Sequence, residues 1–308
     1  MRVITQYSFG GPEVLTTVER PDPTAGPDEV VIRTGAIGVN PVEAVVRSGR
    51  FPLLGDPPFT LGWDISGVVT EVGDKVRDLA VGDRVFGMPR FPLAADGYAE
   101  LVVAPAVEVA ATPNGLDDQQ AAAVPLVSLT AYQALVEVGR LAVGNRVLIP
   151  AAGGGVGHVA VQIAKARGAY VIGTASPGKL DFVRSIGTDE VIDYTTEDLR
   201  DIAPVDLAID PLGGPATGDL LDAVGDGGIL ALLVGQFEDA VIEAAAARNI
   251  RLARISVVPN HEALADIADL IRHGQLMPHV SATFPLEKAG EAHTHLDIGV
   301  QGKVVLLP

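Results

Sequence analysis

Short apolar runs separated by glycine, proline and aspartate dominate residues 1 to about 120 of this chain. Glu29–Thr34 and Gly67–Gly73 are two such runs, with Val or Ile at most of their central positions. Runs of β-branched residues bounded by turn-forming residues are typical of short antiparallel strands. We therefore predict a β-barrel-like domain in the first part of the chain.

The pattern changes after about residue 120, where helical periods alternate with short apolar strands. The first helix is expected to begin near Asp117. Helices and strands that alternate in this way predict a doubly wound parallel sheet. The predicted strands are Arg146–Ile149, Tyr170–Gly173, Glu190–Ile192, Leu207–Ile209, Ile229–Val234 and Ile250–Ile255.

The pattern changes again after about Ser256, and the tail is more like the first segment than the middle one. We therefore expect two domains, one built from residues 1–120 and 257–308 and the other from residues 121–256. The elements predicted in the tail are a helix at His261–His273, a strand at His279–Phe284, a short helix at Leu286–His295 and a strand at Lys303–Leu307.

A strand-like run, Val147–Pro150, leads into the small-residue segment Ala151–Gly157, which an apolar helix pattern follows. Glycines here let the chain turn tightly, let backbone N–H groups approach a pyrophosphate, and let the helix pack close to its strand. The usual G-x-G-x-x-G pattern becomes Ala152-x-Gly154-x-x-Gly157, with alanine in the first position. We interpret the segment as a dinucleotide-binding turn, with a glycine-rich surface turn as the alternative.

The end of the next predicted strand indicates which dinucleotide is bound. An NAD-specific domain usually carries Asp or Glu there for the ribose 2′-hydroxyl. This chain has Ser176-Pro177-Gly178-Lys179 instead, which offers a hydroxyl and an ammonium to a 2′-phosphate. We therefore predict NADP(H) as the cofactor. The alternative is that Lys179 only opens the next helix as a solvated charge.

Composition limits the function further. The 308 residues are 48% hydrophobic and 20% charged, enough for two domains with cores of their own. The net charge of −17 opposes binding to nucleic acid and to anionic membrane surfaces, so neither is expected as a partner. The chain has no cysteine, no signal-peptide pattern and no apolar stretch near the roughly 20 residues of a membrane helix. We therefore expect a cytoplasmic protein.

Six motifs, in order, resemble those of the medium-chain dehydrogenases/reductases, in the zinc-free quinone oxidoreductase (zeta-crystallin-like) branch. The resemblance implies an α/β fold, with a GroES-like β-barrel catalytic domain built from both ends of the chain and a Rossmann domain between them. It also implies an active site between the domains, at the carboxyl ends of the parallel strands. The motifs are Gly38–Pro41, Gly62–Val69, Val81–Gly87, Gly97–Glu100, Leu129–Tyr132 and the turn Ala151–Gly157 with Gln162.

The resemblance also identifies the positions where a catalytic zinc would bind. The ligands of the zinc-dependent alcohol dehydrogenases align with Asn40, Trp63 and Leu126, and none of these is Cys or His. Leu and Trp do not bind zinc. His293 and His295 form the only close histidine pair, and we expect them on the surface because positions i and i+2 of a helix point apart. We therefore expect no metal.

By the same resemblance, the protein transfers hydride from NADPH to a small molecule, either a quinone or an activated alkene. Asn40 and Thr130 are the implied catalytic residues, near the nicotinamide and its ribose. In the alternative interpretation, Asn40 only sets a turn before Pro41, and Thr130 only caps or packs a helix. The residues implied to bind the cofactor are Gly154, Gly155, Val156 and Gly157 at the pyrophosphate, Thr174, Ser176, Lys179 and Tyr194 on the adenosine side, and Val234 and Gly235 at the carboxamide.

One departure from the family pattern affects the substrate. Many quinone oxidoreductases carry a tyrosine in the helix after the asparagine, where this chain has Val45. No general acid is then evident, and the proton is expected from solvent or a ribose hydroxyl. Glu43 and Asp64 are expected to be structural, with Glu43 paired to Arg47 one helical turn later and Asp64 bonded to backbone near the Gly62–Gly67 turn.

Two other functions stay open at this stage. One is an NADPH-dependent double-bond reductase of enones, enals or enoyl thioesters. The other, from a different class, is an NADPH-binding structural or sensing protein with little turnover. In either case the family resemblance implies a homodimer, with Ile250–Ser256 as the edge strand that pairs across a two-fold axis.

Overall fold

The computed structural model describes residues 1–308, which divide into two compact units. Unit 1 contains residues 1–129, 258–273 and 278–308, and unit 2 contains residues 130–257 and 274–277. Helix α3 (Pro125–Tyr132) includes the boundary between residues 129 and 130. Each unit is built around its own sheet.

Unit 1 is mainly antiparallel. Its larger sheet has the strand order β15-β16-β3-β5-β6-β8, with β7 also paired to β3, and a smaller sheet has the order β2-β1-β4. The strands are β1 (Arg2–Gln6), β2 (Thr16–Glu19), β3 (Glu29–Val39), β4 (Phe59–Thr60), β5 (Asp64–Val72), β6 (Arg84–Gly87), β7 (Leu101–Pro105), β8 (Val109–Ala111), β15 (Val280–Pro285) and β16 (Lys303–Leu307).

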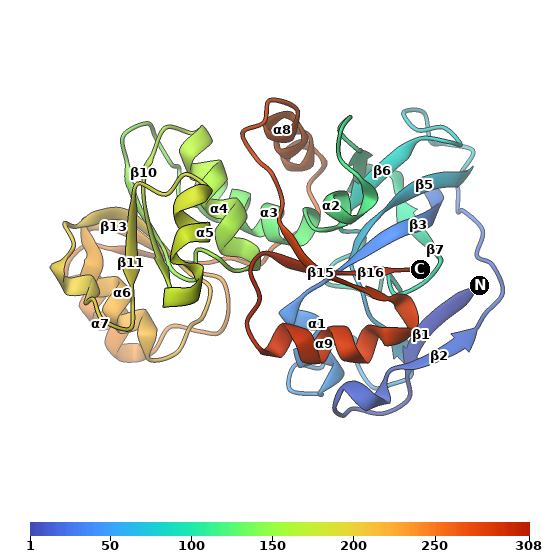
Figure 1. Ribbon diagram of the computed structural model, residues 1–308, viewed down its shortest axis with the longest axis horizontal. Coiled ribbons are helices and arrows are strands. Elements are labelled where there is room, and N and C mark those ends of the chain that lie inside the picture. The colour runs from blue at the N-terminus through green and yellow to red at the C-terminus, as the bar shows by residue number, and fades with distance from the viewer. The chain divides into compact units, whose positions relative to one another are not determined.

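The long strand β3 organises this unit. One of its edges pairs with β5 along most of its length, while the other pairs first with β7 and then with β16. The last strand of the chain therefore lies directly beside β3. The helices of the unit are α1 (Pro41–Arg47), α2 (Asp118–Ala122), α8 (His261–Arg272) and α9 (Ala289–Asp297), of which α1 and α9 lie side by side (Figure 1).

Unit 2 is a parallel sheet with the order β11-β10-β9-β12-β13-β14. The chain starts at β9, fills one side of the sheet and then returns to fill the other, so β9 and β12 meet at the switch point where doubly wound folds bind ligands. The strands are β9 (Arg146–Ile149), β10 (Tyr170–Ala175), β11 (Glu190–Asp193), β12 (Val205–Asp210), β13 (Val224–Leu232) and β14 (Arg251–Arg254).

Helices cover both faces of this sheet. Helices α4 (Gly155–Ala166) and α5 (Leu180–Ser185) lie on one face, and α6 (Ala216–Ala223) and α7 (Asp239–Ala247) lie on the other (Figure 1). The core between the sheet and the helices α6 and α7 includes Leu148, Ile172, Ala208 and Leu230, one from each of four adjacent strands. The predicted doubly wound sheet is therefore confirmed.

Most predicted elements are present within a few residues of their expected bounds. The largest difference is at β13, which begins at Val224 rather than at Ile229. Its first half contains the segment Gly225–Gly228, which has no apolar side chain and therefore gives no strand pattern in the sequence. The short helix predicted at Leu286–His295 is a 3₁₀ turn, Leu286–Lys288, followed by α9. No helix of the structure is long and apolar enough to cross a membrane.

Candidate functional site

The glycine turn, Ala151–Gly157, connects the carboxyl end of β9 to α4 in unit 2. The Ala152 N–H donates to the Thr174 carbonyl of β10 at 2.9 Å, and the Gly154 N–H donates to the Ala151 carbonyl at 2.8 Å. Gly154 is the N-cap residue of α4 and has an extended backbone. The turn is therefore held against β10 before the helix begins.

Glycine is needed at position 157 because α4 starts in contact with the turn itself. A Cβ atom at Gly157 would lie 2.2 Å from the Ala151 carbonyl oxygen and 2.7 Å from the Ala152 Cα. Both are backbone atoms, which cannot move aside without changing the turn. This is the close approach of helix and strand that the third glycine of a dinucleotide-binding turn permits.

Ala152 stands where such turns usually carry their first glycine, and the structure shows how its methyl group is accommodated. Ala152 is fully buried beside β10. A Cβ atom at Gly173 of β10 would come within 2.9 Å of the Ala152 Cβ. The space that the first glycine normally leaves is thus provided by a glycine on the neighbouring strand.

The start of α4 offers backbone donors. Gly155, Val156 and Gly157 form its first turn, and the His158 N–H donates to the Gly154 carbonyl at 3.0 Å. The first N–H groups of an α-helix have no partner within the helix and lie at the positive end of its dipole. The structure therefore brings the four predicted residues at positions 154–157 together as a cradle that suits an anion such as a pyrophosphate.

Lys179 lies beside the same turn. Ser176 follows β10 and is the N-cap residue of a 3₁₀ turn, Pro177–Lys179. A Cβ atom at Gly153 would lie 3.3 Å from the Lys179 Cδ, so the aliphatic part of this lysine packs over the turn backbone. Partial burial lowers the pKa of the Lys179 ammonium. The structure thus brings together the glycine turn and the lysine predicted to bind a 2′-phosphate.

The remaining predicted cofactor residues also lie at the carboxyl ends of the strands in unit 2. Ala175 of β10 pairs with Asp193 of β11, so Ser176 and Tyr194 are the next residues on two adjacent strands. Tyr194 is 58% exposed. Val234 and Gly235 follow β13 and are exposed, whereas the Thr174 side chain is buried.

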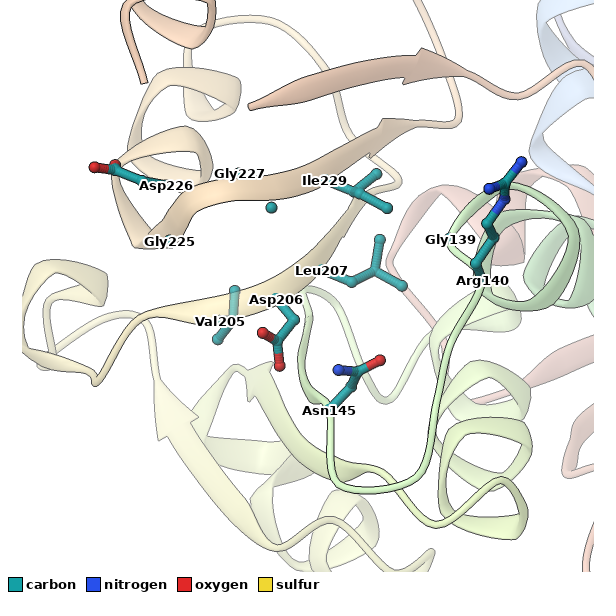
Figure 2. Close-up of a pocket in the computed structure, with 11 residues that line it drawn as sticks. Gly139, Arg140, Asn145, Val205, Asp206, Leu207, Gly225, Asp226, Gly227 and Ile229 are labelled. Carbon is teal, nitrogen blue, oxygen red and sulfur yellow. The ribbon is translucent and has the colours of Figure 1, made fainter. Parts of the chain in front are cut away.

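A pocket of about 320 Å³ opens at the opposite end of this sheet (Figure 2). It is lined by residues at the amino ends of β9, β12 and β13, among them Asn145, Asp206 and Gly225. Asp206 accepts the Arg146 N–H at 2.8 Å, and Asn145 accepts the Ala142 N–H at 2.8 Å, so both are engaged by nearby backbone. Doubly wound folds bind their ligands at the carboxyl ends of the strands. The pocket is therefore not the cofactor site.

The two predicted catalytic residues belong to different units. Thr130 lies in α3 at the start of unit 2, and Asn40 follows β3 in unit 1. Asn40 is completely buried, and three charged residues hold it. Its backbone N–H donates to Glu43 Oε2 at 2.8 Å, its Nδ2 donates to Asp64 Oδ2 at 2.9 Å, and its Oδ1 accepts a short hydrogen bond from Lys303 Nζ.

A second set of side chains continues from Glu43. The Tyr98 hydroxyl donates to Glu43 Oε2 at 2.6 Å and lies 2.9 Å from His293 Nε2, while Arg47 Nη1 lies 2.7 Å from His293 Nδ1. Because arginine can only donate, Nδ1 of His293 accepts and the ring hydrogen is on Nε2. Hydrogen bonds therefore run in one direction, from Arg47 through His293 and Tyr98 to Glu43. We call these residues, with Asn40, Asp64 and Lys303, the Asn40 cluster.

Burial changes the proton affinities of Glu43 and His293, two titratable members of this hydrogen-bonded chain. Burial raises the pKa of the Glu43 carboxyl to about 7, although bonds from Tyr98 and from the Asn40 backbone oppose the shift. Burial, helped by the Arg47 charge, lowers the pKa of His293 to about 3. At neutral pH the histidine is therefore uncharged.

Two expectations for these residues are wrong. Glu43 does not pair with Arg47, because the Tyr98 hydroxyl and the Asn40 N–H bind its carboxylate. His293 is not a surface residue: it is fully buried, while His295 on the other side of α9 is partly exposed. Asp64 does bind backbone, at the Leu126 N–H (2.6 Å) rather than within its own turn.

Sequence reasoning did not identify Tyr98, His293 and Lys303 as members of this cluster. Tyr98 lies in one of the motifs quoted above, and Lys303 is the only charged residue of the predicted strand Lys303–Leu307. The one available signal was a lysine at the start of an otherwise apolar strand. Because charged residues are rarely buried without a partner, a buried lysine at this position would need an acceptor nearby.

The three positions that align with zinc ligands have other roles here. Asn40 is bonded as described, Trp63 Nε1 donates to the Leu93 carbonyl at 2.7 Å, and the Leu126 N–H donates to Asp64. No group of three or more His, Cys, Asp and Glu side chains is arranged to hold a metal ion.

Comparison with known proteins identifies the family. Residues 26–114 match the alcohol dehydrogenase GroES-like domain, and residues 186–306 match the family described as zinc-binding dehydrogenase. The quinone oxidoreductase of Homo sapiens is 32% identical over 330 residues, which cover 100% of this chain and 98% of that protein.

Two solved structures superpose along the whole chain. The quinone oxidoreductase of Escherichia coli complexed with NADPH has a TM-score of 0.90 at 28% identity, and covers 100% of both chains. A structure described as an NAD-dependent alcohol dehydrogenase has a TM-score of 0.92 at 33% identity, again with 100% of both chains covered. The expected GroES-like and Rossmann folds are confirmed, and this chain belongs to the quinone oxidoreductase family of the medium-chain dehydrogenases/reductases, which are oxidoreductases.

Proposed function

We propose that this protein is an NADPH-dependent, zinc-independent oxidoreductase that reduces a quinone or another electron-poor acceptor. The observation that supports the cofactor assignment is the position of Lys179, whose side chain packs over the glycine turn where an NAD-specific domain would carry a carboxylate. One of the similar structures is described as NAD-dependent, so the choice between the two cofactors rests on this lysine and on Ser176.

The residues of unit 2 suit the parts of NADPH. Gly154 to Gly157 offer backbone donors to the pyrophosphate, and Ser176, Lys179 and Tyr194 lie where the adenosine 2′-phosphate is expected. Val234 and Gly235 are proposed to meet the carboxamide. When bound, NADPH supplies the hydride, and with one proton the quinone becomes a hydroquinone.

Asn40 and Thr130 are the residues proposed to contact the reacting groups. No ionisable hydroxyl stands at position 45, where many relatives have tyrosine, and the carboxylates nearest to Asn40, those of Glu43 and Asp64, are bonded to other groups of the protein. We therefore propose that the proton comes from solvent or from a ribose hydroxyl rather than from a carboxylic acid of the chain.

The surroundings of Asn40 support zinc independence. The Lys303 ammonium donates to the amide oxygen of Asn40, at one of the positions that align with a zinc ligand. A buried ammonium at that position would repel a divalent cation. The chain thus places a positive charge of its own where zinc-dependent relatives bind a metal.

A spectroscopic assay tests this function. Protein and NADPH are mixed with a panel of quinones, enones and enals, and the absorbance of the reduced nicotinamide is followed with and without a metal chelator. We expect consumption that is fastest with quinones and unchanged by the chelator. Tight NADPH binding without consumption for any acceptor would overturn the enzymatic function, and faster turnover of enones would favour a double-bond reductase.

We also propose that the protein is a homodimer. Strand β14 is at the edge of the unit 2 sheet and pairs only with β13, so its other edge can add a strand from a second copy. Light scattering at micromolar concentration checks this, and a mass of 31.9 kDa would contradict it.

A further inference from the structure

Three adjacent strands of unit 1 bring distant residues to Asn40. Strand β3 ends just before Asn40, and its neighbours β5 and β16 both run antiparallel to it. The first residues of these neighbours, Asp64 and Lys303, therefore lie beside the end of β3. Gly38 makes this approach possible, because a Cβ atom there would lie 2.8 Å from the Asp64 Cβ and 2.4 Å from the Ala122 carbonyl oxygen.

The Lys303 ammonium is fully engaged. It donates to the Val39 carbonyl at 3.1 Å, to Asp64 Oδ2 at 3.1 Å and to Asn40 Oδ1, which uses all three of its N–H groups. Lys303 is 2% exposed and Asp64 is completely buried. A buried ion pair of this kind contributes little net stability compared with apolar residues of similar volume, because both charges lose their hydration.

What the ion pair does provide is a defined orientation for the Asn40 amide. Lysine can only donate and a carboxylate can only accept, so the amide oxygen must face Lys303 and the nitrogen must face Asp64. A flipped amide would place its nitrogen against the Lys303 ammonium, where both groups are donors, and its oxygen against the Asp64 carboxylate, where both are acceptors. The backbone N–H of Asn40 is fixed separately by Glu43.

These contacts also determine which hydrogen-bonding group of the Asn40 amide is available to a further partner. One N–H of Nδ2 is used by Asp64, so a second N–H remains for another partner. The ammonium at Oδ1 draws electron density from the amide and strengthens this N–H as a donor. Asn40 is thus prepared to donate a hydrogen bond rather than to accept one.

We propose that Lys303 and Asp64 are positioning residues that hold the Asn40 amide so that its remaining N–H donates to the carbonyl oxygen of the acceptor. This inference rests on the proposed function. The residues predicted to bind the pyrophosphate, the adenosine side and the carboxamide of the cofactor all lie in unit 2, whereas Asn40 belongs to unit 1, and we assign its N–H to the acceptor rather than to the nicotinamide ribose. Oxygen gains negative charge as a quinone accepts hydride, and a fixed donor stabilises that charge.

A double-mutant cycle tests whether Lys303 acts through Asn40. The variants are Asn40→Ala, Lys303→Met and the two combined, with 1,4-benzoquinone as acceptor and Lys288→Met, an exposed lysine of the same unit, as the matched control. We expect each single variant to lower kcat at least 10-fold, and Lys303→Met to lower it less than 2-fold further when Asn40 is already alanine. Equal losses from Lys303→Met in both backgrounds would overturn the positioning role.

The affinity for NADPH, measured without quinone, tests the choice of ligand. We expect dissociation constants within 3-fold of the unmodified protein for Asn40→Ala and Lys303→Met. A loss of NADPH affinity as large as the loss of kcat would overturn the assignment of Asn40 to the substrate. If Lys303→Met does not fold, Asp64→Asn with Lys303→Met replaces it, because this pair leaves no single charge buried.

A measurement without turnover separates this proposal from the proposed function. The side-chain amide signal of Asn40, assigned by its loss in Asn40→Ala, is followed by nitrogen-15 NMR and hydrogen exchange. We expect strong protection in the unmodified protein and at least 10-fold faster exchange in Lys303→Met. Rapid exchange in the unmodified protein would overturn the proposal. A protected, Lys303-dependent amide in a protein that turns over no acceptor would overturn the proposed reaction and support the orienting contacts.

Discussion

The glycine turn of unit 2 offers backbone groups, whereas the Asn40 cluster of unit 1 consists of side chains that hold one another. The turn is a continuous segment whose shape depends on the absence of side-chain atoms, as at Gly157. The Asn40 cluster joins residues as far apart in sequence as Asn40 and Lys303, and its contacts depend on charge. A proposed binding site can thus be built from local small residues or from distant buried ones, and the two kinds of site respond to different substitutions.

The largest effect is expected from adding one methyl group to the turn. Gly157→Ala places a Cβ atom 2.2 Å from the Ala151 carbonyl oxygen, so the turn must change shape and its N–H groups move. We expect NADPH affinity, measured by calorimetry, to fall at least 100-fold. Gly218→Ala in α6 is the matched control, because open space surrounds that position, and it should leave the affinity unchanged. A Gly157→Ala protein that binds within 3-fold of the original would show that the turn does not need this glycine.

This contrast also explains how much the sequence could predict. The turn and the strands of unit 2 were predictable because glycine spacing and apolar periods are local, and the predicted β9 has the observed bounds. For the Asn40 cluster, Asn40 was recognised through its motif, but its partners depend on which strands neighbour β3. That order is set by packing of the whole unit, and no local pattern contains it.

The next effect is on stability and distinguishes the Asn40 cluster by its pH dependence. The folded protein binds a proton at Glu43 more tightly than the unfolded chain does, since the pKa rises from 4.5 to about 7. This contribution to stability is present below about pH 4.5 and is lost as the pH rises to about 7. His293 behaves oppositely: its pKa falls from 6.5 to about 3, so its contribution is present above pH 6.5 and is lost on acidification.

The two contributions oppose each other between pH 4.5 and 6.5, so single variants should reveal them. Relative to the unmodified protein, we expect Glu43→Gln to lose about 2 kcal/mol of unfolding free energy when the pH falls from 6.5 to 4.5. His293→Gln should lose a similar amount when the pH rises over the same range. Urea denaturation at a series of pH values measures both, and parallel curves for all three proteins would contradict the assigned proton affinities.

A smaller effect separates the two cofactors at the edge of the glycine turn. Lys179→Ala removes an ammonium whose aliphatic stem packs over Gly153, so it should weaken binding of the 2′-phosphate. We expect the dissociation constant for NADPH to rise about 10- to 100-fold and that for NADH less than 3-fold. Lys75→Ala, an exposed lysine of unit 1, is the matched control. Equal losses of affinity for NADPH and NADH would mean that Lys179 supports the turn and does not bind the 2′-phosphate.

The smallest effect concerns the alanine that replaces the first glycine of the turn. Gly173→Ala would place its new methyl group 2.9 Å from the methyl group of Ala152. This crowding should lower the unfolding free energy by about 1–3 kcal/mol. Adding Ala152→Gly removes one of these methyl groups, so the double variant should recover at least half of the loss. Thermal and urea denaturation measure the three proteins. If Ala152→Gly brings no recovery, the crowding comes from Thr188 and Val183 instead, which lie 3.1 and 3.2 Å from the added Cβ. Recovery would show that Ala152 of the turn and Gly173 of β10 pack as a pair, in which only one of the two positions can carry a methyl group.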